Sequence, residues 1–309
     1  MITRKEFLKK SAWLAAGSAL PLLGANRLLA ASSLSGITIL YTNDTHARLD
    51  PFPDNAVEFA GLGGIARRAS LVNKIRAQEK NVLLLDAGDV FQGTPWFDVY
   101  GGKVDLELMT KMNYDAMAIG NHEFDRGPDG FAEAAQKAGF PILASNYQVK
   151  DTPMNPYVQR LLVKEFNGFR VGIFGLGIQL DGVVPRDLYG DVQYRNPVAW
   201  ARGMSNSLRR YHHCDYVICL SHLGYRYNDE RINDLKLAGQ VDGIDLIIGG
   251  HTHTFLDNPV SVTNPDGKQT LITQMGHGGV RLGRIDLNLS ERNSPFGMNS
   301  RFYTIGEKT

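Results

Sequence analysis

Polar motifs rich in aspartate and histidine follow apolar, strand-like segments at five points along this chain of 309 residues. The apolar segments are continuous and are separated by helical stretches, which indicates sheets that are buried on both faces. Such folds place their chemistry in loops at the carboxyl ends of strands, so motifs that are far apart in sequence can converge. The five motifs are Asp44-Thr45-His46, Gly88-Asp89, Gly120-Asn121-His122-Glu123, His222 and Gly250-His251-Thr252-His253.

The same pattern predicts an α/β chain. Strands are expected over residues 37–41, 82–86, 116–119, 141–144, 169–175, 216–220, 246–248, 270–274 and 281–289. Helices are expected over residues 63–80, 104–112 and 131–138. Because no internal repeat or long linker interrupts this pattern, residues 32–309 are interpreted as one domain.

Residues 1–31 have the composition of an export signal. A basic start is followed by an apolar stretch over residues 12–23, which is too short to span a bilayer, and then by small residues. Residues 3–9 resemble the twin-arginine export motif, with Lys5 where the second arginine usually stands, and an ordinary secretory signal is the alternative. The mature protein is therefore expected in the periplasm or outside the cell, without a membrane anchor after cleavage.

Charge and cysteine content argue against two classes of function. Five basic residues and one acidic residue give residues 1–31 a net charge of +4, whereas the remainder has 28 basic and 31 acidic residues. A mature domain with a small negative charge does not favour a nucleic-acid footprint. Cys219 lies in a predicted strand and is expected in the core, so neither a disulfide with Cys214 nor a cysteine zinc site is expected.

The residue types in the five motifs are those that hold divalent metals. Carboxylate oxygens suit hard cations, and zinc, manganese and iron also accept imidazole nitrogen. Asp44 and His46 are two residues apart, which puts both side chains on one face of an extended segment, and His251 and His253 repeat this spacing. Asp89 has two carboxylate oxygens and is the natural bridge between two metals. Together the motifs predict a two-metal site that hydrolyses a phosphate ester.

Several of these residues also have plainer interpretations. A single Asp-x-His can be a solvated turn, and Asn121 can be a helix N-cap, a position that asparagine favours. His212, His213 and His277 are expected at the surface or near a turn, with a place in the site as an alternative for His277. Aromatic residues near the motifs fit either nucleobase contacts or packing beneath the loops; they are Phe91, Trp96, Phe97, Tyr100, Tyr225 and Tyr227.

The set of motifs resembles that of the calcineurin-like metallophosphoesterase superfamily, which is D-x-H, G-D, G-N-H-E/D, H and G-H-x-H. Three longer strings, over residues 41–46, 88–94 and 120–125, are similar to the 5′-nucleotidase family within it. The resemblance extends over about residues 37–290. It implies an α/β fold of the dinuclear metallophosphoesterase type, a four-layer α/β/β/α sandwich with two mixed sheets.

The resemblance also implies residue roles. One metal is expected at Asp44, His46, Asp89 and His253, and the second at Asp89, Asn121, His222 and His251. Manganese, zinc, iron and cobalt all suit this set. His122 and Asp125 match the catalytic dyad of the family, and Asn121 and His122 are its expected phosphate contacts. A metal-activated hydroxide is expected to attack phosphorus while His122 stabilises the developing charge or protonates the leaving oxygen.

The expected substrate is a nucleotide or a related phosphomonoester. Family 5′-nucleotidases usually carry a second, C-terminal domain with an aromatic clamp for the nucleobase, whereas this chain stops after the catalytic domain. Base contacts are therefore expected from its own loops or from a separate chain that supplies such a domain. The alternatives are a phosphodiesterase or sulfur-ester hydrolase of the same superfamily, and a non-catalytic metal-binding subunit, which an intact pair of His122 and Asp125 argues against.

Overall fold

The structure is a computed structural model that describes residues 36–289 and 298–307. The export signal predicted for residues 1–31 lies outside the described residues. Within the described part, every helix is too short or too polar to cross a membrane.

Seven strands form the first sheet, in the order β15-β14-β1-β2-β3-β4-β6. Five consecutive members of this sheet run parallel: β1 (Ile37–Thr42), β2 (Val82–Asp86), β3 (Ala116–Ala118), β4 (Ile142–Leu143) and β6 (Val158–Gln159). Strand β14 (Arg281–Leu287) pairs antiparallel with both β1 and the edge strand β15 (Met298–Thr304). The first sheet is therefore mixed, with a parallel centre.

Six strands form the second sheet, in the order β12-β13-β11-β10-β8-β7. The parallel strands are β8 (Phe169–Gly177), β10 (Tyr216–His222), β11 (Leu246–Gly249) and β13 (Gln269–Thr273). The antiparallel edge strands are β7 (Leu161–Phe166) and β12 (Val260–Thr263). A small separate sheet pairs β5 (Tyr147–Gln148) with β9 (Gln193–Tyr194).

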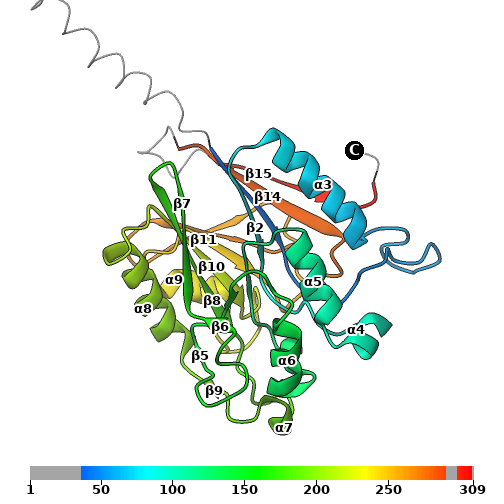
Figure 1. Cartoon of the computed structure of the whole chain (residues 1–309). Coiled ribbons are helices and arrows are strands. Elements are labelled where there is room, and N and C mark those ends of the chain that lie inside the picture. Colours follow the sequence, from blue (N-terminus) through cyan, green and yellow to red (C-terminus); the bar gives the residue numbers. More distant parts are fainter. Residues whose placement is uncertain (1–35, 290–297, 308–309) are drawn as a thin grey trace, which may run out of the picture.

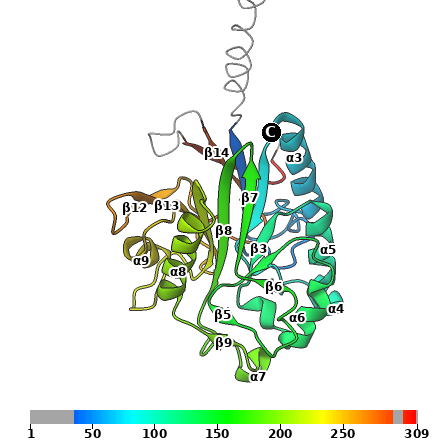
Figure 2. The same ribbon diagram turned by 60° about the vertical axis from the view of Figure 1, so that its left-hand side comes forward.

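Helices cover the outer face of each large sheet (Figures 1 and 2). On the side of the first sheet lie α3 (Ile65–Gln78), α4 (Pro95–Tyr100), α5 (Lys103–Lys111) and α6 (Gly127–Ala135). On the side of the second sheet lie α8 (Pro197–Arg210) and α9 (Asp234–Gln240). The short helices are η1 (His122–Phe124), a single 3₁₀ turn, and α7 (Arg186–Tyr189).

The central strands alternate their side chains between different layers. Leu40 of β1 packs in a cluster with residues of α3, α5 and α6, whereas its neighbour Ile39 packs in the cluster between the sheets. In β10, Ile218 joins the cluster between the sheets and Val217 joins the cluster under α8 and α9. Successive side chains of a strand point to opposite faces, so three apolar clusters separate four layers. The predicted four-layer sandwich with two mixed sheets is confirmed.

The nine predicted strands and three predicted helices are present, with ends that shift by up to four residues. Helices α4, α8 and α9 and the edge strands β7, β12 and β15 were not predicted. Helix α8 begins with Asn196 as N-cap and Pro197 in its first turn, which is a recognisable start signal. Its buried residues Ala201, Ser205 and Leu208 also recur at helical spacing, so this helix could have been predicted.

Candidate metal centre

The five motifs gather where the carboxyl ends of parallel strands from the two sheets meet. Strands β1, β2 and β3 are parallel neighbours in the first sheet, and β10 and β11 are parallel neighbours in the second. His222 is the last residue of β10, while the other four motifs occupy loops just after their strands. Nδ1 of His222 lies 2.8 Å from the carbonyl oxygen of Ala87, which follows β2. This contact joins the edges of the two sheets at the centre of the motifs.

Five candidate ligands have a left-handed backbone. The φ angle is 49° at Asp44 and His46, 55° at Asp89, 71° at His251 and 52° at His253. Residues other than glycine seldom adopt this backbone conformation. Where they do, contacts with the surrounding structure hold them in it, often at functional sites. The prediction that Asp44 with His46, and His251 with His253, lie on extended segments is therefore wrong.

Backbone pairing between loops explains the sharp turn after β1. The N–H of Asp44 donates to the carbonyl of Gly88 at 2.9 Å, and the N–H of His46 donates to the carbonyl of Asp89 at 3.1 Å. The N–H of Ala47 continues the series to Val90 at 2.7 Å. The loop after β1 thus runs alongside the loop after β2 and is hydrogen-bonded to it. These tertiary contacts bring the ligand side chains together without an extended segment.

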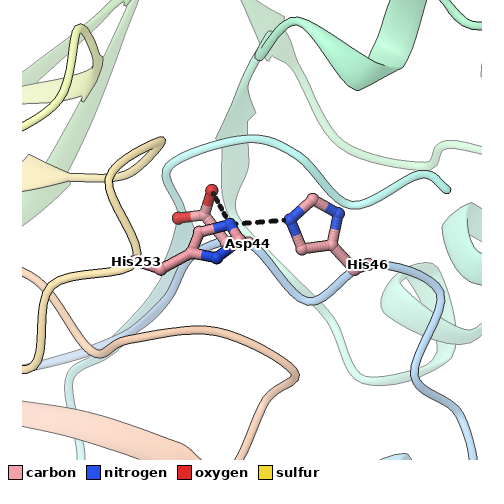
Figure 3. Close-up of side chains that lie close together, drawn as sticks. All are labelled: Asp44, His46 and His253. Carbon is pink, nitrogen blue, oxygen red and sulfur yellow. Dashed lines mark hydrogen bonds and ion pairs between the residues drawn. The ribbon is translucent and has the colours of Figure 1, made fainter. Parts of the chain in front are cut away.

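Asp44, His46 and His253 form the first group of candidate ligands, and one donor atom from each lies within 4.8 Å of the others. Figure 3 shows the two imidazole rings and the carboxylate pointing toward one another. Nε2 of His46 lies 3.0 Å from Nε2 of His253, which lies 3.5 Å from Oδ1 of Asp44. Nδ1 of His46 faces the carbonyl oxygen of Phe91 at 3.2 Å and must carry the hydrogen there, because a carbonyl only accepts. The neutral ring then presents the Nε2 lone pair to the group.

Asp89, His222 and His251 form the second group, with the same spread of at most 4.8 Å. The contact to Ala87 places the hydrogen of His222 on Nδ1, which leaves Nε2 for a cation. This buried Nε2 atom lies 3.0 Å from Oδ2 of Asp89 but makes no hydrogen bond. Nδ1 of His251 lies 2.7 Å from Oδ1 of Asn121, so the fourth predicted ligand of this group is adjacent to it.

The two groups fit a pair of divalent cations. Each combines one carboxylate with two imidazoles, a set that zinc, manganese, iron and cobalt all accept. The groups are neighbours, because Nε2 of His222 is also 3.9 Å from Oδ1 of Asp44. Among the described residues, the buried Nε2 atom of His222 has no hydrogen-bond partner, and a bound cation would supply one. Asp89 belongs to the second group, and its role as a bridge to the first stays a prediction.

The electrostatics of the centre also favour positive charge. Burial lowers the pKa of His222, but the Asp89 and Asp44 carboxylates outweigh burial and raise this pKa to about 10. Burial raises the pKa of Asp89, yet the nearby His222 more than offsets it and holds the pKa below its usual range. Burial, together with the charge on His222, lowers the pKa of His251 to about 4. The Asp89 carboxylate thus stays ionised and draws positive charge to the site, which a bound cation would provide.

His122 and Asp125 form a close pair beside the two groups. Nδ1 of His122 lies 2.8 Å from Oδ2 of Asp125, and both side chains are partly exposed. The ring of His122 is 5.3 Å from that of His46, centre to centre. Asn121 occupies the N-cap position of η1, but its side chain makes no capping hydrogen bond. The side chain instead faces His251, so the plainer interpretation of Asn121 as a helix cap does not account for it.

A comparison with protein families identifies the chain. The model of the calcineurin-like phosphoesterase family matches residues 37–255. The chain belongs to this family. The predicted superfamily is therefore confirmed, and members of this family use divalent metals. All seven predicted metal ligands and the pair of His122 and Asp125 lie within the matched residues.

Curated relatives carry the name 5′-nucleotidase, as the resemblance implied. The snake venom 5′-nucleotidase of Naja atra is 34% identical over 277 residues, which are 83% of this chain and 51% of that protein. The human 5′-nucleotidase is 33% identical over 283 residues, with 83% of this chain and 47% of that protein covered. The chain thus spans about half the length of these relatives.

A solved structure of a family relative confirms the fold. The 5′-nucleotidase precursor of Thermus thermophilus superposes with a TM-score of 0.79 at 32% identity. The superposition covers 87% of this chain and 54% of the Thermus chain. The shared part is therefore the half of the relative that contains the phosphoesterase fold.

In this phosphoesterase, three buried polar side chains that were not predicted as functional hold the ligand loops. Glu123 accepts hydrogen bonds from backbone N–H groups of the loop after β2, and Asn43 donates to Asp44 Oδ2 at 2.6 Å. Gln274 donates to the carbonyl of Gly250 at 2.6 Å and accepts the N–H of Thr254. Glu123 could have been noticed as part of its motif. Asn43 lies in a string that resembles the 5′-nucleotidase family, whereas only tertiary contacts distinguish Gln274.

The aromatic residues near the motifs divide into packing and exposed positions. Phe91 and Phe97 are buried and pack together with ring centres 5.5 Å apart, as the packing interpretation predicted. Trp96 and Tyr100 stack at 5.8 Å, are partly exposed, and line a cavity of about 370 Å³ with Arg48 and Asp50.

Tyr227 lies near the second group: its ring is 6.4 Å from that of His251, centre to centre, and its hydroxyl donates to the carbonyl of Leu223 at 2.7 Å. Tyr225 is partly buried and packs against the apolar cluster under α8 and α9. These two positions therefore take part in local packing, while Tyr227 also reaches the edge of the second group.

The remaining predictions concern histidines and cysteines. His277 stacks on His253 with ring centres 4.6 Å apart, so it adjoins the first group, which is the alternative that the sequence left open. His212 and His213 lie in the turn after α8, as expected. Cys214 and Cys219 are both free and buried, which confirms that they form no disulfide.

Proposed function

We propose that this phosphoesterase is an exported, dinuclear metal-dependent phosphohydrolase that acts as a 5′-nucleotidase-like phosphomonoesterase. The observation that carries the proposal is the pair of three-ligand groups beside the contact of His122 with Asp125. A metal-binding subunit would need no proton donor next to its ligands. The names of the relatives in the comparisons support nucleotides as the substrate class.

The residues of the chain account for the steps of the reaction. Two divalent cations, held by Asp44, His46 and His253 and by Asp89, His222 and His251, would supply Lewis acidity and lower the pKa of a water. The amide of Asn121 and the ring of His122 would contact the phosphate. Asp125 orients the ring of His122 through Nδ1, so Nε2 can stabilise charge on the phosphate or protonate the leaving oxygen.

A panel of substrates tests the proposal. The mature, metal-reconstituted protein should hydrolyse AMP and 4-nitrophenyl phosphate, and monoesters should exceed cyclic nucleotides and bis(4-nitrophenyl) phosphate. Asp89→Asn should abolish this activity, while Asp98→Asn on the surface of α4 should retain it. Preference for diesters would favour the phosphodiesterase alternative. Absence of hydrolysis of every phosphate ester, or full activity of Asp89→Asn, would show that the proposal is wrong.

The proposal includes a second polypeptide that supplies nucleobase contacts. Its support is that the matched region makes up only 51% of the Naja atra relative and 54% of the Thermus chain. Co-purification from the native host should recover such a partner, and its addition should lower the KM for AMP. A micromolar KM for AMP with the isolated chain would count against a partner. In that case the cavity lined by Trp96 and Tyr100 becomes the candidate base site.

Export is the third part of the proposal and is supported by the composition of residues 1–31. Cell fractionation should recover the mature protein outside the cytoplasm. Changing both Arg4 and Lys5 to alanine should stop export by the twin-arginine route, whereas an ordinary secretory signal should tolerate the loss of this pair. Cytoplasmic retention of the wild-type protein would contradict export.

A further inference from the structure

Glu123 has a buried side chain that accepts four hydrogen bonds from backbone N–H groups. Its side chain is 1% exposed at the centre of η1. Oε2 accepts the N–H of Asp89 at 3.0 Å and the N–H of Gly120 at 2.6 Å. Oε1 accepts the N–H of Val90 at 2.8 Å and the N–H of Phe91 at 3.2 Å. One side chain of the third motif therefore holds the backbone of the second motif as well as its own.

The second motif in turn accepts a hydrogen bond from the third. Oδ1 of Asp89 accepts the N–H of His122 at 2.8 Å. The two loops thus exchange hydrogen bonds, since the carboxylate of each accepts backbone N–H groups of the other. This exchange resembles the reciprocal contacts of a helix capping box, but it joins segments more than 30 residues apart. The backbones of Asp89 and His122 are fixed relative to each other by these bonds.

The loop after β2 needs such a restraint. Asp89 has a φ angle of 55° and follows Gly88 at 93°, so two successive residues are left-handed. Non-glycine residues keep this conformation only when neighbouring contacts determine it. Glu123 accepts the backbone N–H groups of three successive residues of this loop, Asp89, Val90 and Phe91, so one side chain restrains the whole turn.

We propose that Glu123 is a positioning residue that holds Asp89 for metal binding and sets its place relative to His122. The proposal rests on the proposed function in one respect, namely that Asp89 is a metal ligand. Partners outside the ligand shell that fix a ligand's orientation commonly change metal affinity or activity by about 10–100-fold when they are removed. Glu123 acts on the backbone of Asp89 and does not itself contact a substrate.

The Glu123→Gln variant tests this role. Glutamine keeps the shape of the side chain but turns an NH₂ group toward one of the two pairs of N–H donors. We expect Mn²⁺ to bind the folded variant about 10–100-fold more weakly by isothermal titration calorimetry, with kcat/KM for AMP reduced and partly restored by excess Mn²⁺. Glu133→Gln is the matched control, because Glu133 is exposed on α6 and forms an ion pair with the surface Lys103.

The Mn²⁺ affinity of the folded Glu123→Gln variant distinguishes a positioning role of Glu123 from a purely structural one. A purely structural role would lower the melting temperature of Glu123→Gln but leave the Mn²⁺ affinity of the folded protein unchanged, and this result would overturn the proposal. Calorimetry needs no substrate, so a wild-type protein that binds Mn²⁺ without hydrolysing any ester contradicts the proposed function alone. A wild-type protein that binds no Mn²⁺ overturns both.

Hydrogen exchange of the wild-type protein gives a second test that does not depend on folding of the variant. The amides of Val90 and Phe91 donate to Glu123 and should exchange slowly in the metal-free protein. Peptides from the exposed loop around Val57 provide the fast-exchanging reference. Rapid exchange of the Val90 and Phe91 amides would show that the restraint does not exist in solution.

Discussion

Both carboxylate oxygens of Asp44 lie within hydrogen-bonding distance of the backbone N–H of His251, at 2.9 and 3.1 Å. Asp44 follows β1 of the first sheet and His251 follows β11 of the second. The buried carboxylate of Asp44 is out of contact with water, so it depends on such donors and on a nearby cation to offset its burial. The first ligand group therefore exists only when the two sheets are packed against each other.

Removal of metal should lower the stability of the protein. Carboxylate oxygens and imidazole nitrogens converge in both groups, and a cation that binds only the folded state stabilises it by about 2.7 kcal/mol at 100 times its Kd. Thermal unfolding should therefore shift to lower temperature after chelation and recover with added MnCl₂. His253→Ala should reduce the Mn²⁺-dependent shift, whereas His212→Ala in the turn after α8 should not. Equal shifts for both variants would contradict the assignment of His253.

Gly120→Ala should disrupt the candidate site. A Cβ atom at Gly120 would lie 2.2 Å from Oδ1 and 2.6 Å from the backbone N of Asp89, so the loop after β2 would have to move. We expect loss of hydrolysis and weaker Mn²⁺ binding. Gly203→Ala is the control, because a Cβ there meets nothing within 4 Å and lies inside α8, where alanine should stabilise by about 0.5–1 kcal/mol. Wild-type activity of Gly120→Ala would show that the loop tolerates displacement.

His122→Gln should lower turnover without loss of metal. His122 lies beside the two groups and pairs with Asp125, whereas the groups themselves consist of other residues. Removal of a proton donor or an electrostatic stabiliser should reduce kcat for AMP by roughly 10²–10⁴-fold. Metal content by mass spectrometry should equal that of the wild-type protein. Asp125→Asn should also lower kcat, while Asp129→Asn on the exposed face of α6 should not; a loss of metal in His122→Gln would argue against the assigned role.

Asp105 should make stability depend on pH. Burial raises the pKa of Asp105 to about 7 in the folded protein, whereas an unfolded aspartate titrates near 4. Between these values the folded state retains a proton that the unfolded state has lost, so the free energy of unfolding falls as pH rises through this range. The Asp105→Asn variant lacks this pH-dependent contribution to the free energy of unfolding. Its stability relative to the wild-type protein should therefore increase by about 3 kcal/mol from pH 5 to pH 8 in urea unfolding; a constant difference would contradict the prediction.

Most of the fold could be predicted because its central strands are unbroken apolar runs. Strands such as β1 and β10 bury both faces, so their composition differs sharply from that of the helices between them. Edge strand β7 is only partly buried and lacks this signal. Helix α8 was missed although it has a start signal at Asn196 and Pro197 and buried residues at helical spacing. Weak apolar contrast accounts for the missed edge strand β7, but it does not account for α8.

The sequence by itself determined which residue types make up the candidate ligands and that each motif lies at the end of a strand. The resemblance implied that Asp44 shares a metal with His46 and His253, and Asp89 one with His222 and His251. Only the tertiary structure brings the donor atoms of each group within 4.8 Å of one another. It also decided the left-handed turns that an extended segment could not have provided. The physical reason is that ligand geometry depends on contacts between loops more than 100 residues apart, such as that of Asp44 with His251. The spacing of residues within a motif does not predict those contacts, nor does it predict the four hydrogen bonds that Glu123 accepts.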